Sequence, residues 1–248
     1  MGDTNMPRFF MAGTNLLGGM AILRGRDAEH VRVLRLRPGE DVIICDGKGT
    51  DYKCRLVYAD KEEAQAEVIE VVPCPAEPSV KVTVLCGLPK GDKTDYIIQK
   101  CVEAGAYEIQ FFLSERCVAK PETPEKKLDR WQRIAEEAAK QSGRGIIPQV
   151  GWIGDYAGAL DCAIKKDLGL FMYETGEREP FNAVLEAHRD IQTCAIMTGP
   201  EGGFAEFEAK LAKITGLHLC SMGERILRCE TAPVVAVSAV MYATGNLS

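Results

Sequence analysis

The chain has 248 residues, of which 46% are hydrophobic and 27% are charged. These proportions are ordinary for a globular protein with a sizeable core, built as one large domain or two smaller ones. The longest apolar run, residues 233–243, is about half of what a bilayer span requires. The N-terminus shows no signal-peptide pattern, so we expect a cytoplasmic protein.

The net charge of −6 argues against a protein that coats nucleic acid through bulk electrostatic attraction. Charge is uneven along the chain, however. Residues 1–55 hold nine basic and seven acidic side chains, and residues 116–149 hold eight basic and five acidic ones. Local basic regions of this kind fit selective docking to nucleic acid, although ordinary solvated surfaces would have the same composition.

The ten cysteines do not follow a metal-binding or redox pattern. No two are spaced as Cys-x-x-Cys, and Cys45, Cys86, Cys194 and Cys220 lie inside apolar, strand-like runs. Thiols in such surroundings usually behave as small buried hydrophobic groups. The three histidines are isolated from one another and from the cysteines. We therefore expect reduced, structural cysteines and no metal site.

The first part of the chain has a strand-like, turn-rich pattern. Residues 42–45 and 52–57 flank Asp46-Gly47, a pair that strongly indicates a hairpin turn. A further strand-like run, residues 64–72, follows a charged turn at residues 60–63. This pattern predicts a small β-barrel or sandwich over residues 1–72.

Residues 73–79 contain three prolines, which prevent regular helix and favour an extended linker. We place the boundary there, between a first domain of residues 1–72 and a second of residues 80–248.

Strand and helix patterns alternate in the second domain. Apolar runs predict strands at residues 80–88, 109–113, 168–173, 192–198 and 217–222. A helix is expected from about Lys93 to Gly105 with Asp92 as its cap, a long one opens at Thr123-Pro124-Glu125, and the last covers residues 231–243. Alternation of this kind, with nearly continuous apolar strands, predicts a parallel sheet covered by helices on both faces.

Ligands of open α/β sheets bind beyond the carboxyl ends of the strands, so the loops there are the places to search. The first such loop is Gly199-Pro200-Glu201-Gly202-Gly203, which we call the glycine loop. Its glycines allow a flat heterocycle or a ribose to approach the backbone closely. Taken alone, this pattern fits a plain strand-to-helix turn better than a ligand site.

The second loop, residues 222–230, precedes the last helix, and we call it the arginine loop. It places apolar Ile226 and Leu227 between Arg225 and Arg228. That combination fits a loop that covers something apolar and something anionic. A surface loop whose apolar residues fill the core explains it equally well.

The usual nucleotide and hydrolase motifs are missing from the chain. There is no Gly-x-Gly-x-x-Gly after a strand, no Walker A motif and no Gly-x-Ser-x-Gly. Dehydrogenases, kinases, serine hydrolases and methyltransferases built on a Rossmann site are therefore disfavoured.

Short segments spread over nearly the whole chain match the sequences of a known protein family, and they occur in the same order. They include residues 6–10, 30–40, 45–47, 89–93, 99–105, 114–116, 137–142, 173–174, 199–203 and 225–232. Together they resemble the RsmE family of 16S rRNA uridine-N3 methyltransferases, within the SPOUT superfamily.

The resemblance implies an α/β trefoil-knotted SPOUT methyltransferase domain with a parallel sheet, preceded by a small PUA-like β-barrel that recognises RNA. It implies S-adenosyl-L-methionine as cofactor, a homodimer, and 16S rRNA or the small ribosomal subunit as partner. The positions that match the family's cofactor contacts are Thr198, Gly199, Glu201, Gly202, Met222, Gly223, Ile226, Leu227 and Ala232.

Methyl transfer requires mainly positioning of the two partners and removal of the N3 proton. We expect Arg228 near the base, Glu230 as a structural anchor or proton acceptor, and Arg116 as a further guanidinium. RNA contacts are assigned to Arg8, Arg24, Arg26 and Arg225.

Two positions depart from the family pattern, since Cys117 and Cys229 stand where a hydroxyl residue is more common. Both are poor candidates for catalysis because a thiol hydrogen-bonds weakly. Two other functions remain open: a knotted methyltransferase acting on another RNA, and a ribosome-assembly factor without catalysis.

Overall fold

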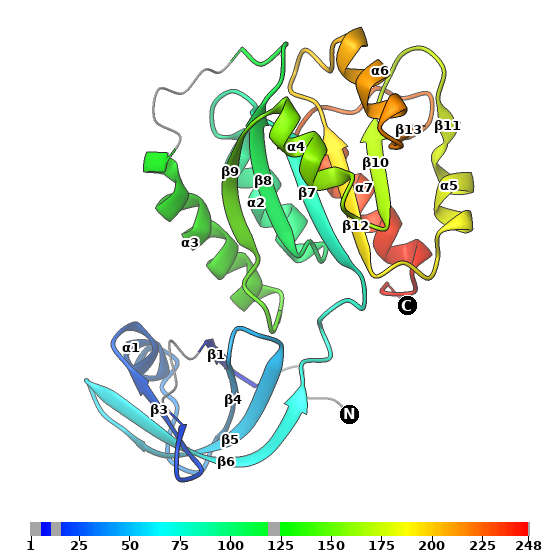
Figure 1. Ribbon diagram of the computed structural model, residues 1–248. Coiled ribbons are helices and arrows are strands. Elements are labelled where there is room, and N and C mark those ends of the chain that lie inside the picture. Colours follow the sequence, from blue (N-terminus) through cyan, green and yellow to red (C-terminus); the bar gives the residue numbers. More distant parts are fainter. Residues whose placement is uncertain (1–5, 11–15, 119–124, 248) are drawn as a thin grey trace. The chain divides into compact units, whose positions relative to one another are not determined.

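The structure, a computed structural model, describes residues 6–10, 16–118 and 125–247, and it divides the chain into two compact units (Figure 1). The first unit comprises residues 1–77 with 139–147, and the second comprises residues 78–138 with 148–248. The domain boundary predicted from the sequence treats each domain as one continuous stretch of chain, so it assigns residues 139–147 to the second domain. The structure groups this segment with the first unit.

The first unit is built on a mixed sheet of six strands in the order β1-β4-β5-β6-β3-β2. Its elements are β1 (Arg8–Phe10), β2 (Leu16–Leu17), β3 (Met20–Arg24), α1 (Arg26–Val33), β4 (Asp41–Cys45), β5 (Thr50–Ala59) and β6 (Glu63–Pro73). Helix α1 packs against β3, β5 and β6, and Val31 joins Phe9, Ile44 and Leu56 in the core.

The hairpin expected at Asp46-Gly47 joins β4 and β5. These strands pair antiparallel from Asp41 opposite Arg55 to Cys45 opposite Asp51. The Asp46 carboxylate accepts hydrogen bonds from the backbone N–H groups of Lys48 and Thr50, at 2.7 and 3.0 Å, which stabilises the turn.

The second unit is built on a seven-stranded sheet in the order β11-β13-β10-β12-β7-β8-β9, with every pair parallel. Its elements are β7 (Lys81–Gly87), α2 (Lys93–Glu103), β8 (Glu108–Leu113), α3 (Glu125–Gln141), β9 (Gln149–Asp155), α4 (Tyr156–Ala163), β10 (Leu168–Met172), β11 (Glu179–Pro180), α5 (Phe181–Ala187), β12 (Thr193–Thr198), α6 (Glu206–Ile214), β13 (His218–Ser221) and α7 (Thr231–Ala243). Thr123 and Pro124, expected to open the long helix, lie outside the described residues. The expected parallel α/β sheet is confirmed, and the trefoil knot stays a prediction.

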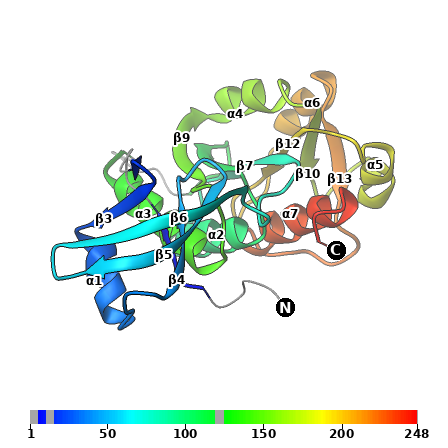
Figure 2. The same cartoon turned by 90° about the horizontal axis from the view of Figure 1, so that it is seen from below.

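Helices cover both faces of this sheet, with α4 and α6 on one side and α2 and α7 on the other (Figure 2). Asp92 occupies the N-cap position of α2 as expected, but its side chain makes no capping hydrogen bond, so that part of the prediction is wrong. No helix in the described ranges is long and apolar enough to cross a membrane.

One carboxylate, that of Glu77, ties residues 139–147 to the segment that follows β6. The Oε1 atom of Glu77 accepts from the Arg144 guanidinium at 2.9 Å and from the backbone N–H groups of Gly145 and Ile146, at 2.7 and 2.9 Å. Its Oε2 atom accepts a second bond from Arg144, at 2.9 Å. The pair is nearly buried, with the side chain of Arg144 only 3% exposed.

We expect Glu77→Ala to lower the free energy of unfolding of this unit by about 3 kcal/mol, because a buried guanidinium would lose its counter-charge. Chemical denaturation followed by circular dichroism measures the loss. Glu70→Ala, which removes an exposed partner of Lys53, is the control and should cost less than about 1 kcal/mol. Equal effects of the two substitutions would contradict the assignment.

Candidate functional site

A cavity of about 530 Å³ lies at the carboxyl edge of the seven-stranded sheet. Its walls come from the loops after β10, β12 and β13, with Lys93 from the start of α2 and Arg116 from the loop after β8. The volume falls within the range usual for small-molecule sites. The position is the one expected of a parallel α/β sheet, where strand ends converge on one edge.

The glycine loop is packed too closely for side chains at several positions. A Cβ atom on Gly199 would lie 3.0 Å from the backbone of Gly203, and one on Gly202 would lie 3.0 Å from Arg116. Gly203 has a φ of +65°, which disfavours any residue with a side chain. The loop therefore presents bare backbone to the cavity.

Buried side chains hold the two ends of the glycine loop. Phe204 packs on Phe171 in the core, with ring centroids 4.2 Å apart. The buried carboxylate of Glu208 accepts from the backbone N–H groups of Ala205, at 2.7 Å, and of Glu115, at 3.0 Å. Because Glu115 precedes Arg116, this carboxylate also fixes the loop that brings Arg116 to the cavity.

Thr198, the last residue of β12, has a hydroxyl that is not satisfied within the protein. The residue is 1% exposed, and its Oγ1 atom has no hydrogen-bond partner in the part of the chain that the structure describes. The Cys86 thiol makes a weak polar contact with it; burial raises the pKa of this thiol to about 12, and the contact with Thr198 partly offsets that rise. A buried hydroxyl with only a thiol beside it, at a cavity wall, points to a ligand that supplies a stronger partner.

The arginine loop forms the opposite wall. Gly223 has a φ of +92°, and the Ser221 hydroxyl donates to the Gly223 carbonyl at 3.1 Å, which turns the chain sharply after β13. Ile226 is 78% exposed, and Arg225 and Arg228 are also exposed. The loop thus offers an apolar tip between two guanidinium groups, and its apolar residues do not fill the core.

An ammonium group joins the two loops. Lys93 Nζ lies 2.9 Å from Glu201 of the glycine loop and 3.4 Å from Glu230 at the end of the arginine loop. It also lies 3.6 Å from the Cys229 sulfur, and the backbone N–H of Lys90 donates to Glu201 at 3.0 Å. We call Lys93, Glu201 and Glu230 the ion cluster.

The cluster keeps its members charged. Burial opposes ionisation of Glu201 and Glu230, but hydrogen bonds outweigh it, so the pKa of each carboxyl is lowered. The hydrogen bond to Glu201 raises the pKa of Lys93. Burial and the adjoining Glu230 raise the pKa of the Cys229 thiol to about 12, which makes this cysteine unreactive.

Comparisons with known proteins agree with this geometry. Residues 76–241 match the model of an RNA methyltransferase domain, and residues 23–69 match that of an RNA methyltransferase PUA domain. The chain is 36% identical over 230 residues to ribosomal RNA small subunit methyltransferase E of Bacillus subtilis, covering 90% of each chain. The Synechocystis protein of the same name is 35% identical, over 84% of this chain and 68% of its own.

The chain belongs to the ribosomal RNA small subunit methyltransferase E family. A crystal structure of the Neisseria gonorrhoeae member, bound to S-adenosyl methionine, superposes with a TM-score of 0.84 at 34% identity, over 96% of this chain and 97% of that one. The RsmE resemblance read from the sequence, including the PUA-like first domain, is confirmed.

All nine residues predicted to contact the cofactor line the cavity: Thr198, Gly199, Glu201, Gly202, Met222, Gly223, Ile226, Leu227 and Ala232. Arg116, Arg225 and Arg228 line it too. Glu230 does not line the cavity. Its carboxylate forms an ion pair with Lys93 and accepts a hydrogen bond from the Cys229 thiol at 3.2 Å. The roles of these residues stay predictions.

The three arginines expected to contact RNA from the first unit differ in their surroundings. Arg8 makes two hydrogen bonds of 2.6 Å to the buried Asp51, and its side chain is only 12% exposed. Arg24 pairs with Glu63 at the surface, and Arg26 is exposed. Only Arg24 and Arg26 therefore remain suitable for contact with a partner.

Sequence reasoning missed Lys93 and the wall that follows β10, which is formed by Met172, Tyr173, Glu174, Thr175 and Arg178. Lys93 and Tyr173 lie in segments that match the RsmE family sequences, and this match was the only sequence feature that could have indicated their place in the site. As for metals, the described residues hold no cluster of three or more histidine, cysteine or acidic side chains suited to one. All ten cysteines are free, and nine of them are buried, which agrees with the structural role expected for them.

We expect Lys93→Met to lower the free energy of unfolding by about 1 kcal/mol at pH 7, since two facing carboxylates would lose their counter-charge. Both carboxyls have a pKa lowered from the ordinary 4.5, so the stabilisation is present above pH 4.5 and is lost as pH falls through the lowered values. The difference from wild type should therefore shrink on acidification below pH 4.5, as measured by urea unfolding. Lys93→Arg, the control, should stay close to wild type; a difference that does not shrink as the pH falls below 4.5 would refute the ionic explanation.

Proposed function

We propose that this protein transfers the methyl group of S-adenosyl-L-methionine to N3 of a uridine in 16S rRNA of the small ribosomal subunit. The observation that carries the proposal is one cavity walled by both the glycine loop and the arginine loop, in a chain whose Neisseria relative is bound to this cofactor. Small subunits are made in the cytoplasm, so we place the activity there.

The residues present fit the cofactor. The unpartnered Thr198 hydroxyl and the bare backbone of Gly199 and Gly202 suit a ribose and a flat purine. Met222 and Leu227 supply apolar contact from the arginine loop. A cavity of about 530 Å³ leaves space for the cofactor and for a base that enters beside it.

The cofactor, when bound, would supply an electrophilic methyl group and leave as the neutral thioether S-adenosyl-L-homocysteine, while the protein positions the uracil, whose N3 proton passes to solvent water as the base enters. Arg228 and Arg116 line the same cavity, so both guanidiniums can stabilise negative charge that develops on the uracil oxygens. Ile226 and Leu227 exclude water from the transfer. N3 lies on the pairing edge, so the nucleotide must be unpaired when it enters.

Glu230 serves as an anchor in this mechanism. Its lowered pKa and its contacts with Lys93 and Cys229 make it a poor proton acceptor. By holding the end of the arginine loop, it fixes the start of α7 and the position of Arg228, whose carbonyl accepts from the Thr231 and Ala232 N–H groups at 2.8 and 3.0 Å.

The direct test is incubation with labelled S-adenosyl-L-methionine and small subunits that lack the modification, followed by mapping of the labelled nucleotide. We expect label at N3 of one uridine in 16S rRNA. Label in transfer RNA would show a knotted methyltransferase with another substrate. Binding to subunits without any transfer would show an assembly factor without catalysis.

The two guanidiniums of the arginine loop should differ in role. Arg228→Ala should lower kcat by about 100-fold, because a group that stabilises charge only in the transition state is lost, with little change in cofactor affinity. Arg225→Ala, the matched substitution three residues away, should raise KM for RNA instead. Steady-state kinetics and calorimetry distinguish them, and an unchanged kcat in Arg228→Ala would remove that residue from the mechanism.

We further propose a homodimer formed through α7. The helix has no charged residue over its 13 positions, yet Val235 and Tyr242, seven residues apart, are 40% and 76% exposed. A helix that is apolar all round is normally covered. A second copy of the chain is the occupant that the resemblance to the RsmE family implies.

Tyr242→Glu should convert the dimer to a monomer at micromolar concentration, because a charge at the interface would be buried without a partner. Sedimentation velocity reports the change. Ile214→Glu, on the surface of α6 and 82% exposed, is the control and should leave the oligomeric state intact. A wild-type monomer would rule the dimer out.

A further inference from the structure

The N-terminal half of α3 carries a group of cations that the proposed mechanism does not use. Lys126, Lys127, Arg130 and Arg133 are all exposed. Arg130 pairs with Asp95 of α2, whereas the other three form no ion pair within residues 6–10, 16–118 and 125–247. Arg133 donates only to the backbone carbonyl of Asp129, at 3.2 Å.

Helix stability does not account for these cations. Positive charges in the first turns of a helix oppose its dipole and destabilise it. The buried face of α3 is formed by Trp131, Ala135 and Ala138, so the lysines and Arg133 contribute nothing to the core. An unpaired group of this kind, on a chain of net charge −6, fits an anionic partner.

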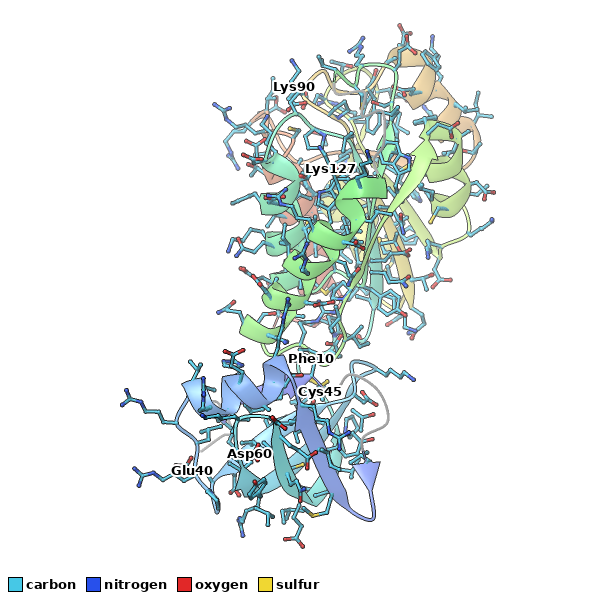
Figure 3. The ribbon with its side chains drawn as sticks, turned by 90° about the vertical axis from the view of Figure 1, so that its left-hand side faces the viewer. Phe10, Glu40, Cys45, Asp60, Lys90 and Lys127 are labelled. Atoms are coloured by element: carbon cyan, nitrogen blue, oxygen red, sulfur yellow. The ribbon has the colours of Figure 1, made fainter. Side chains whose placement is uncertain are left out.

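The group is joined to the edge of the cavity. Arg130 is paired with Asp95 in the first turn of α2, two residues beyond Lys93, which lines the cavity. Lys90, exposed and without an ion pair in the described structure, precedes the same turn. Figure 3 shows Lys90 and Lys127 on the same side of this unit.

We propose that Lys126, Lys127 and Arg133, continued by Lys90, bind backbone phosphates of the RNA that flank the reacting nucleotide. We call these four residues the phosphate strip. From Lys126 to Arg133 the helix rises about 10 Å, which matches roughly three steps of a stacked strand at ~3.4 Å each. The strip therefore holds the strand while the base enters the cavity. This inference rests on the proposed function.

The test compares two variants that each lose one lysine and one arginine. Lys126→Ala with Arg133→Ala removes two members of the strip. Lys166→Ala with Arg189→Ala, the control, removes cations that precede β10 and β12, at the opposite edge of the sheet. Binding of unmodified small subunits and of naked 16S rRNA is measured over a range of salt concentrations, together with KM, kcat and cofactor affinity.

The strip variant should bind both forms of RNA about tenfold more weakly at low salt. Its plot of log affinity against log salt should be shallower by about 1.4, since each lost contact to a single strand removes about 0.7. KM should rise while kcat and cofactor affinity stay at wild-type values, and the control should match wild type. Lys126→Arg with Arg133→Lys should restore binding, because phosphate contact requires charge at these positions.

Two results would overturn the proposal that the phosphate strip binds RNA. In one, wild type methylates the subunit and the strip variant keeps its salt dependence and KM. In the other, binding to subunits weakens but binding to naked rRNA does not, which would identify a ribosomal protein as the partner. A wild-type protein that methylates no RNA would refute the proposed function itself, and the salt dependence of binding still reports on the strip.

Discussion

Attraction between one ammonium and two carboxylates defines the site. Lys93 lies between Glu201 and Glu230, which belong to loops that follow different strands of the sheet. Without that counter-charge the two carboxylates would repel each other, which weakens the link between the two walls. The glycine loop would keep its own anchors, Phe204 and Glu208, so Lys93 matters most for where the arginine loop lies.

The sequence predicted what depends on local pattern. Nearly continuous apolar strands predicted the parallel sheet, and loops at strand ends predicted where the cavity lies. Contacts between distant residues could not be read in this way. Lys93 and Glu201 are 108 residues apart, and Arg8 resembled an exposed RNA contact until its pairing with Asp51 was seen. Residues 139–147 join the first unit through Glu77, a tertiary hydrogen-bond network that no periodicity shows.

Charge placement explains how an acidic protein can act on RNA. Arg116, Arg225 and Arg228 line the cavity, and the proposed phosphate strip would extend this positive charge from Lys90, three residues before Lys93 of the cavity wall. Among the acidic side chains of the cavity wall, Glu201 is paired with Lys93, which also contacts Glu230 just outside the wall. Attraction limited to one edge of the sheet favours a single docked orientation over sliding along RNA.

The central claim is that the glycine and arginine loops form one binding site for S-adenosyl-L-methionine, and calorimetry tests it most directly. We predict one molecule bound per chain with a Kd in the micromolar range. Gly199→Val should abolish binding in a protein that still folds, because its side chain would collide with the backbone of Gly203. A wild-type protein that binds no cofactor, or a Gly199→Val variant that binds it as well as wild type, would contradict the account.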